Sequence, residues 1–224
     1  MNTTEKISKY MDEKFSEYKK PVTELSKTDE NDFIISDTLM IDWDEISKLH
    51  EGDDLSSVDA IYCYIENNTL TLYFFEFKNL SLHEKFFDAK KQLSDLLNDL
   101  DKCVFSCCYP KELKEVKKKV ISKKIISLKT KPLESLILLN NLLNDAGISS
   151  EEITSINKEY YIISETPIDG NKSNWHRGKR NKEIFGFIDK IKPFPFSEIN
   201  HLNERRFLSL INTLQKNNEY GSVR

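Results

Sequence analysis

Asp59, Glu76 and Lys78 combine two carboxylates with an ammonium group around one predicted β-hairpin. Glu76 and Lys78 are two residues apart, so on a strand their side chains point to the same face. Asp59 begins the partner strand, and a hairpin brings its two ends together. Buried charges without partners are costly, and a divalent cation bound by both carboxylates removes that cost. The spacing therefore predicts a cation site at the end of a sheet.

The oxygen atoms at this position suit Mg²⁺ or Mn²⁺. We expect Asp59, Glu76 and the backbone carbonyl of Phe77 to be the metal ligands. The metal would polarise a scissile phosphate and lower the pKa of a bound water. Lys78 would orient or deprotonate that water and offset negative charge in the transition state. This division of roles predicts hydrolysis of a phosphodiester bond.

The hairpin itself is predicted from residue types. Residues 58–65 and 69–77 are rich in aromatic and β-branched side chains, and Glu66, Asn67 and Asn68 separate them. Asn tolerates the positive φ of a tight turn. The second strand is apolar on both faces, which predicts a central position in its sheet. Other acid-x-Lys pairs, such as Asp12-Lys14, lie in helical or polar stretches, where residues i and i+2 do not share a face.

The remaining chain predicts alternating helices and strands around the hairpin. Apolar spacing predicts a helix over 4–20, a strand within 33–46, a polar turn at 50–57, helices over 82–100, 111–128 and 132–145, strands at 159–164 and 185–191, and a closing helix over 201–216. Gly147 is expected to end the helix over 132–145. This order indicates an α/β or α+β class with a mixed sheet.

The arrangement Asp59, hairpin, Glu76-Phe77-Lys78 resembles the D…(D/E)-x-K signature of the PD-(D/E)XK nuclease superfamily. The resemblance covers residues 4–100 and 159–164, and Val58 stands where the family often has proline. It implies a restriction-endonuclease-like α/β fold, a three-layer core with a mixed sheet flanked by helices, in a single domain over 1–224 with a helical insertion at about 101–155. It also implies Asp59 and Glu76 as Mg²⁺ ligands and Lys78 as the catalytic lysine.

The resemblance extends to neighbouring segments. The helix after the motif carries Lys85 and Gln92, and Gln92 resembles the catalytic-site glutamine of RecB-like members. Members often add an acidic residue from the first helix, and three candidates stay open: Glu13, Glu17 and Glu24.

Basic segments indicate a nucleic-acid partner, DNA being the expected one, although the net charge is −4. Residues 111–131 carry nine Lys against two Glu. The loop at 169–182 combines Trp175 with Arg177, Lys179 and Arg180, and Lys85 adds a further cation. Cations and an aromatic face suit a phosphate backbone with an unstacked base. The alternative for each segment is a solvated surface.

Composition limits the other possibilities. No stretch approaches the ~18 apolar residues of a membrane span, and the polar start contains no apolar signal core. The four cysteines are too few and uneven for a disulfide framework, so we expect a cytoplasmic location. Residues 132–143 are apolar nearly all round, so this helix is either central in the core or part of a homodimer interface.

Two alternatives to a nuclease remain open from the sequence. The first is a catalytically silent nucleic-acid-binding or assembly protein on the same fold, with no metal affinity at Asp59 and Glu76. The second is an unrelated α+β protein whose hairpin charges only solvate a sheet end. That second alternative requires Glu76 and Lys78 to be exposed and distant from Asp59.

Overall fold

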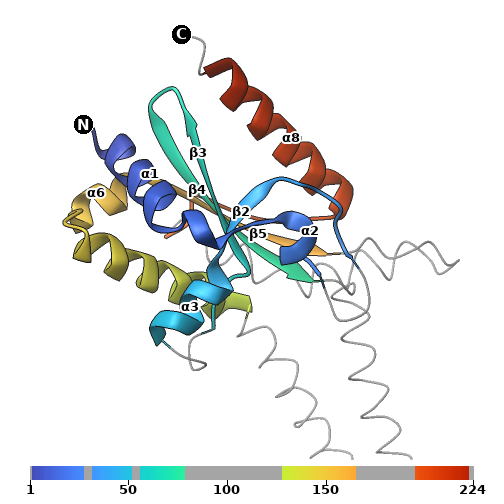
Figure 1. The fold of residues 1–224 in the computed structure, drawn as a ribbon, viewed down its shortest axis with the longest axis horizontal. Helices are drawn as coiled ribbons and strands as arrows, with labels where there is room; N and C mark the ends of the chain where they lie inside the picture. Colours follow the sequence, from blue (N-terminus) through green and yellow to red (C-terminus); the bar gives the residue numbers. More distant parts are fainter. Residues whose placement is uncertain (1, 28–31, 52–55, 79–127, 165–194, 222–224) are drawn as a thin grey trace, which may run out of the picture.

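The computed structural model describes residues 2–27, 32–51, 56–78, 128–164 and 195–221. Within these ranges the chain forms a six-stranded mixed sheet with helices on both faces (Figure 1). The prediction of an α/β class with a mixed sheet is therefore confirmed. The expected helix over 82–100, the expected helix over 111–128 apart from its last residue, and the expected strand at 185–191 lie outside the described residues.

The strands lie side by side in chain order. They are β1 (Lys19–Pro21), β2 (Leu39–Asp42), β3 (Ala60–Glu66), β4 (Thr69–Lys78), β5 (Asn157–Ser164) and β6 (Glu198–Leu202). The first four pair antiparallel, whereas β4–β5 and β5–β6 pair parallel. A parallel pair needs a crossover connection, and the segment between β4 and β5 supplies it. β4 has a paired neighbour on each side, so the central position that its apolar sequence predicts is confirmed.

The hairpin of β3 and β4 closes through a two-residue turn. Asn67 and Asn68 have φ values of 49° and 63°, and a turn with positive φ at both central residues matches the twist of the flanking strands. Ala60 pairs with Phe75 and Glu66 with Thr69, which fixes the register over the whole hairpin. This register puts the residue before Ala60 opposite Glu76.

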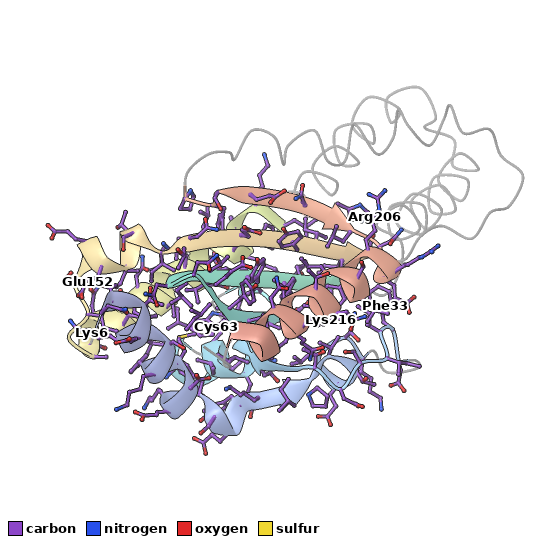
Figure 2. All side chains as sticks on the ribbon, turned by 90° about the horizontal axis from the view of Figure 1, so that it is seen from above. Lys6, Phe33, Cys63, Glu152, Arg206 and Lys216 are labelled. Carbon is purple, nitrogen blue, oxygen red and sulfur yellow. The ribbon has the colours of Figure 1, made fainter. Side chains whose placement is uncertain are left out.

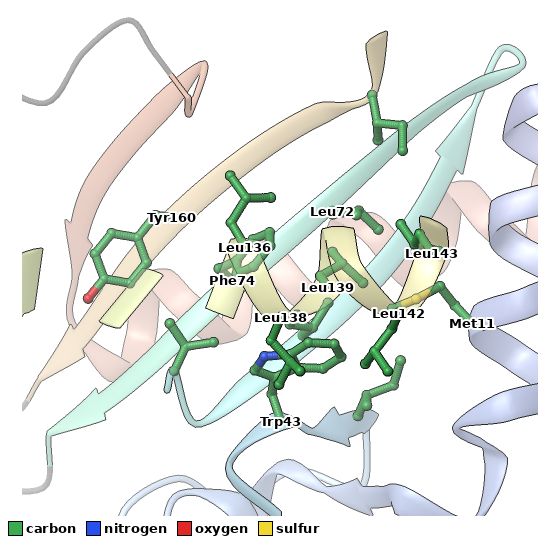
Figure 3. Close-up of a cluster of buried hydrophobic side chains, with 14 of the residues drawn as sticks. Met11, Trp43, Leu72, Phe74, Leu136, Leu138, Leu139, Leu142, Leu143 and Tyr160 are labelled. Carbon is green, nitrogen blue, oxygen red and sulfur yellow. The ribbon is translucent and has the colours of Figure 1, made fainter. Parts of the chain in front are cut away.

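One face of the sheet is covered by α1 (Thr3–Lys14), α3 (Trp43–Glu51), a helix at residues 128–145 and α6 (Ser150–Ser155). Leucines of the helix at 128–145 pack on Leu72 and Phe74 of β4 and on Trp43 (Figure 3). Each fully buried leucine of this kind contributes about 2 kcal/mol through apolar burial. The helix ends where Gly147 takes a φ of +79°, as predicted.

The helix at 128–145 belongs to this core on one side only. Leu139 and Leu143 are fully buried, while Leu133 and Ile137 are 36% and 58% exposed. The prediction that the helix is central in the core is confirmed for that side. Whether the other side forms a dimer interface stays a prediction.

The opposite face carries α8 (Glu204–Gly221) and the short α2 (Val22–Leu25) (Figure 1). Phe207 of α8 packs edge-on against Phe75 and Phe77 of β4, with ring centroids 5.3 and 5.5 Å apart. Because strand side chains alternate between faces, Phe75 and Phe77 point toward α8, whereas Glu76 and Lys78 point toward the helices of the first face.

Several predicted boundaries are wrong. The helix expected over 4–20 ends at Lys14, and a 3-10 turn (Ser16–Tyr18) and β1 follow it. The strand expected within 33–46 is present as Leu39–Asp42, but it is the second strand rather than the first. α3 begins at Trp43, inside that range, and ends at Glu51, within the expected polar turn at 50–57. The closing helix begins at Glu204, after the unpredicted strand β6. β1 and β6 are short edge strands with weak alternation, so their pairing depends on neighbours rather than on local sequence.

No helix in the described part of the chain is long and apolar enough to cross a membrane.

Candidate functional site

Asp59 extends the antiparallel ladder one step beyond the first residue of β3. Its N–H donates to the Phe75 carbonyl at 3.0 Å, and its own carbonyl accepts from the Trp43 N–H at 3.2 Å. Its carboxylate Oδ2 accepts from the Phe77 N–H at 2.5 Å. The side chain thus replaces the backbone acceptor that β3 no longer provides, which fixes one carboxylate oxygen against β4.

Glu76 is fully buried, with a side-chain exposure of 0%. Its Oε1 contacts the Lys78 ammonium and lies 2.8 Å from the ammonium of Lys131. The other oxygen, Oε2, is buried and has no hydrogen-bond partner within the described ranges. An unpartnered buried carboxylate oxygen is costly, so this atom marks a place where a further positive group fits.

Lys131 connects the two carboxylates. Its Nζ lies 3.9 Å from Asp59 Oδ1 as well as 2.8 Å from Glu76 Oε1. The side chains of Asp59, Lys78 and Lys131 are 25%, 21% and 21% exposed, so the cluster is buried at Glu76 and reaches solvent at its rim. Asp59, Glu76 and Lys78 therefore converge as the sequence predicts.

Tyr160 is a buried residue of β5, the strand next to β4. Pro132 has no N–H to bond the Leu128 carbonyl one turn earlier, and the Tyr160 hydroxyl donates to that carbonyl at 3.3 Å instead. Burial and the nearby charges of Glu76 and Asp59 raise the pKa of Tyr160 well above its usual value. Tyr160 thus remains neutral near pH 7.

The electrostatics of the cluster favour proton or cation binding. Burial, followed by the charge of Glu76, raises the pKa of Asp59 to about 7, although Lys78, Lys131 and the Phe77 N–H oppose the shift. Burial alone would lower the pKa of Lys131, but the carboxylates of Glu76 and Asp59 outweigh it and raise that pKa. Asp59 therefore holds a proton at higher pH than an ordinary aspartate does.

The donor set fits a hard divalent cation. Asp59 and Glu76 supply carboxylate oxygens, and the N–H and C=O of one strand residue point to the same side, so the Phe77 carbonyl faces the side of Asp59. Three protein oxygens with added water or phosphate oxygens suit Mg²⁺. Among the residues described, no group of three His, Cys, Asp or Glu side chains is placed to hold a metal.

The absence of a three-ligand group among the described residues also applies to the three N-terminal glutamates predicted as possible additions to the site. Glu13, Glu17 and Glu24 are all exposed, and Glu13 pairs with Lys9 at 3.7 Å. The structure does not bring any of them into a three-ligand group with Asp59 and Glu76.

The other predicted site residues lie outside the described residues. They are Gln92, proposed as catalytic, and the nucleic-acid-binding candidates Lys85, Trp175, Arg177, Lys179 and Arg180.

Sequence reasoning missed the role of Lys131 in this cluster. Lys131 belongs to the basic run at 111–131, which predicts a phosphate-binding surface or a solvated helix face, and nothing in its spacing links it to Glu76. A second unpredicted pair lies next to Lys78. Ser164, the register partner of Lys78, is hydrogen-bonded to His201 of β6, and burial lowers the pKa of His201 to about 4.

Comparison with known proteins identifies no relative: no family model, no curated protein and no solved structure matches this chain.

Proposed function

We propose that this chain is a metal-dependent nuclease of the PD-(D/E)XK type that hydrolyses DNA phosphodiester bonds. The observation that carries the proposal is the convergence of Asp59, Glu76 and Lys78 at one end of the hairpin, with a buried Glu76 oxygen that has no partner among the described residues. The mixed α/β sheet with helices on both faces is compatible with the restriction-endonuclease-like core of that superfamily.

Asp59, Glu76 and the Phe77 carbonyl would hold Mg²⁺ or Mn²⁺. A cation held there would polarise the scissile phosphate and supply an acidified water as the nucleophile. Lys78 lies at the solvent-facing rim of the cluster, where its ammonium can orient the attacking water and offset charge on the phosphate oxygens. The Phe77 N–H keeps the Asp59 carboxylate in place for ligation.

The positions of the charged side chains argue against the second alternative, an unrelated α+β protein in which these charges only solvate a sheet end. That reading requires an exposed Glu76 distant from Asp59, yet Glu76 is fully buried and one ammonium, that of Lys131, contacts both carboxylates.

One observation favours a second candidate function, a catalytically silent nucleic-acid-binding protein. Two ammonium groups, from Lys78 and Lys131, balance the two carboxylates of the cluster without a metal. A buried ion-pair network of this kind can be kept for conformational specificity alone. This second function predicts binding of DNA without hydrolysis and without metal affinity.

The test is incubation of the purified chain with single-stranded, duplex and branched DNA in Mg²⁺ or Mn²⁺. RNA of matched sequence shows whether the substrate is DNA. Wild type runs beside E76Q and K78M, and both variants are expected to lose cleavage because they remove a metal ligand and the proton-handling ammonium. Circular dichroism verifies that each variant is folded.

Asp12 and Lys14 provide a matched control, because they have the same acid-x-Lys spacing outside the cluster. D12N and K14M should cleave at the wild-type rate. DNA binding with no hydrolysis of any substrate would favour the silent function instead, and equal cleavage by K78M would contradict the proposed role of Lys78.

A further inference from the structure

Lys131 occupies the space between the two carboxylates that a shared cation needs. Its Nζ lies 2.8 Å from Glu76 Oε1 and 3.9 Å from Asp59 Oδ1. A divalent ion bound by these oxygens would stand within a few ångströms of the ammonium, and like charges at such separations repel strongly in a buried site. The ammonium and the metal ion therefore compete for the same oxygens.

The position of Lys131 is fixed by its helix. Glu134 accepts the Ser56 N–H at 2.7 Å and Ser135 accepts the Val58 N–H at 2.9 Å. Residues 131, 134 and 135 lie on one side of a helix because of the three- and four-residue spacing. These contacts fasten the helix at 128–145 to the segment that leads into Asp59, so Lys131 is part of the cluster rather than a loose surface lysine.

The long side chain of Lys131 can nevertheless move away from the two carboxylates. It is 21% exposed, and a lysine stem has several rotatable bonds, so the ammonium can move to solvent or to a substrate phosphate while the helix stays in place. Glu76 Oε1 then keeps its contact with Lys78, while Asp59 Oδ1 and the unpartnered Glu76 Oε2 become available to one ion.

We propose that Lys131 is a positioning residue that substitutes for the divalent cation in the metal-free protein and must leave Glu76 before the metal binds. The inference rests on the proposed metal-dependent function and adds its regulation: Lys131 keeps the buried carboxylates neutralised when no metal is bound and lowers the affinity for metal. Tight metal binding then requires an alternative anion, such as a substrate phosphate, to accept the ammonium.

The test is the affinity for Mn²⁺ alone, measured by isothermal titration calorimetry on the full chain at constant pH and salt. K131M should bind Mn²⁺ on the order of tenfold or more tightly than wild type, because the competing charge is gone. K131Q retains a donor for Glu76 and should tighten binding less, which provides a second variant if K131M folds poorly. E76Q should abolish binding in either background.

Lys6 supplies the control for a general loss of positive charge. It pairs with Glu152 at 3.1 Å where α1 and α6 meet (Figure 2). Thr4, in the same helix, donates to the Asn68 carbonyl at the hairpin turn. This turn precedes the first residue of β4, whereas Glu76 lies near the other end of that strand. K6M should leave the Mn²⁺ affinity unchanged.

The outcomes separate this inference from the nuclease proposal. Tighter binding by K131M supports the inference, since loss of a merely structural lysine would weaken the site. Equal or weaker binding by folded K131M and K131Q, with measurable binding by wild type, overturns the inference and leaves the metal site standing. Absence of Mn²⁺ binding in wild type and in both variants overturns the inference and the proposed metal site together.

Discussion

Replacement of Asp59 by Asn should stabilise the metal-free protein above pH 7. The pKa of Asp59 is raised from 3.8 to about 7 by burial and by the charge of Glu76, so folding disfavours its ionised form. Asn resembles the neutral acid in shape and can still accept the Phe77 N–H through its amide oxygen. The variant therefore keeps the local contacts and removes the cost of the charge.

The sign follows from the difference between the folded and unfolded states. Below about pH 4, Asp59 is neutral in both states and the substitution has no electrostatic effect. As the pH rises from about 4 to 7, Asp59 ionises in the unfolded chain but not in the folded one, so wild type loses stability. Above pH 7 the loss is constant at about 4 kcal/mol, which corresponds to a pKa raised from 3.8 to about 7. Because a quarter of the side chain is exposed, we expect about 2 to 4 kcal/mol.

The assay is urea unfolding in EDTA at several pH values between 4 and 8.5, followed by circular dichroism. Asp44 provides a control with the opposite sign. Burial raises the pKa of Asp44, but hydrogen bonds from Lys48 and Ser57 outweigh it and lower that pKa, so D44N should be less stable than wild type by a constant amount above about pH 4. The reasoning is refuted if D59N shows no gain between pH 4 and 7, or if D44N and D59N change in the same direction.

Three further substitutions test the fold that positions the site. N68V should lower the free energy of unfolding by about 1 to 2 kcal/mol because a β-branched residue is strained at a φ of 63°, whereas N68G should not lower it. Equal melting temperatures for the two variants would contradict the turn geometry. L139A should cost about 2 to 5 kcal/mol in urea unfolding because Leu139 is fully buried, while I137A on the exposed side should change stability by less than about 0.5 kcal/mol. S135A should lower the free energy of unfolding by about 1 to 3 kcal/mol because the Val58 N–H loses its acceptor. Hydrogen exchange at the Val58 amide should also accelerate, and an unchanged exchange rate would show that this contact does not fasten the helix.

The hairpin and its charged end could be predicted from the sequence because local signals agree there. Asn67 and Asn68 specify the turn, and the apolar β4 specifies a central strand. Once the turn is fixed, the register puts Asp59 opposite Glu76 without further information. The side-chain period of two then assigns Glu76 and Lys78 to one face.

Longer-range features could not be predicted in the same way. Lys131 reaches Glu76 only because the helix at 128–145 packs across the sheet, and that packing depends on contacts between segments far apart in sequence. β1 forms by pairing Lys19 and Lys20 with β2, although the preceding periodicity favours a continued helix. In both cases tertiary contacts override the local preference.

We propose that Asp59, Glu76 and Lys78 hydrolyse DNA with a divalent metal, and the most direct test is a single-turnover cleavage rate. We predict cleavage in Mg²⁺ that EDTA abolishes, and a rate for folded K78M at least about 100-fold below wild type, the lower range for loss of a proton-transferring group. Cleavage that persists in EDTA, a K78M rate equal to wild type, or no cleavage of any DNA substrate would contradict the claim.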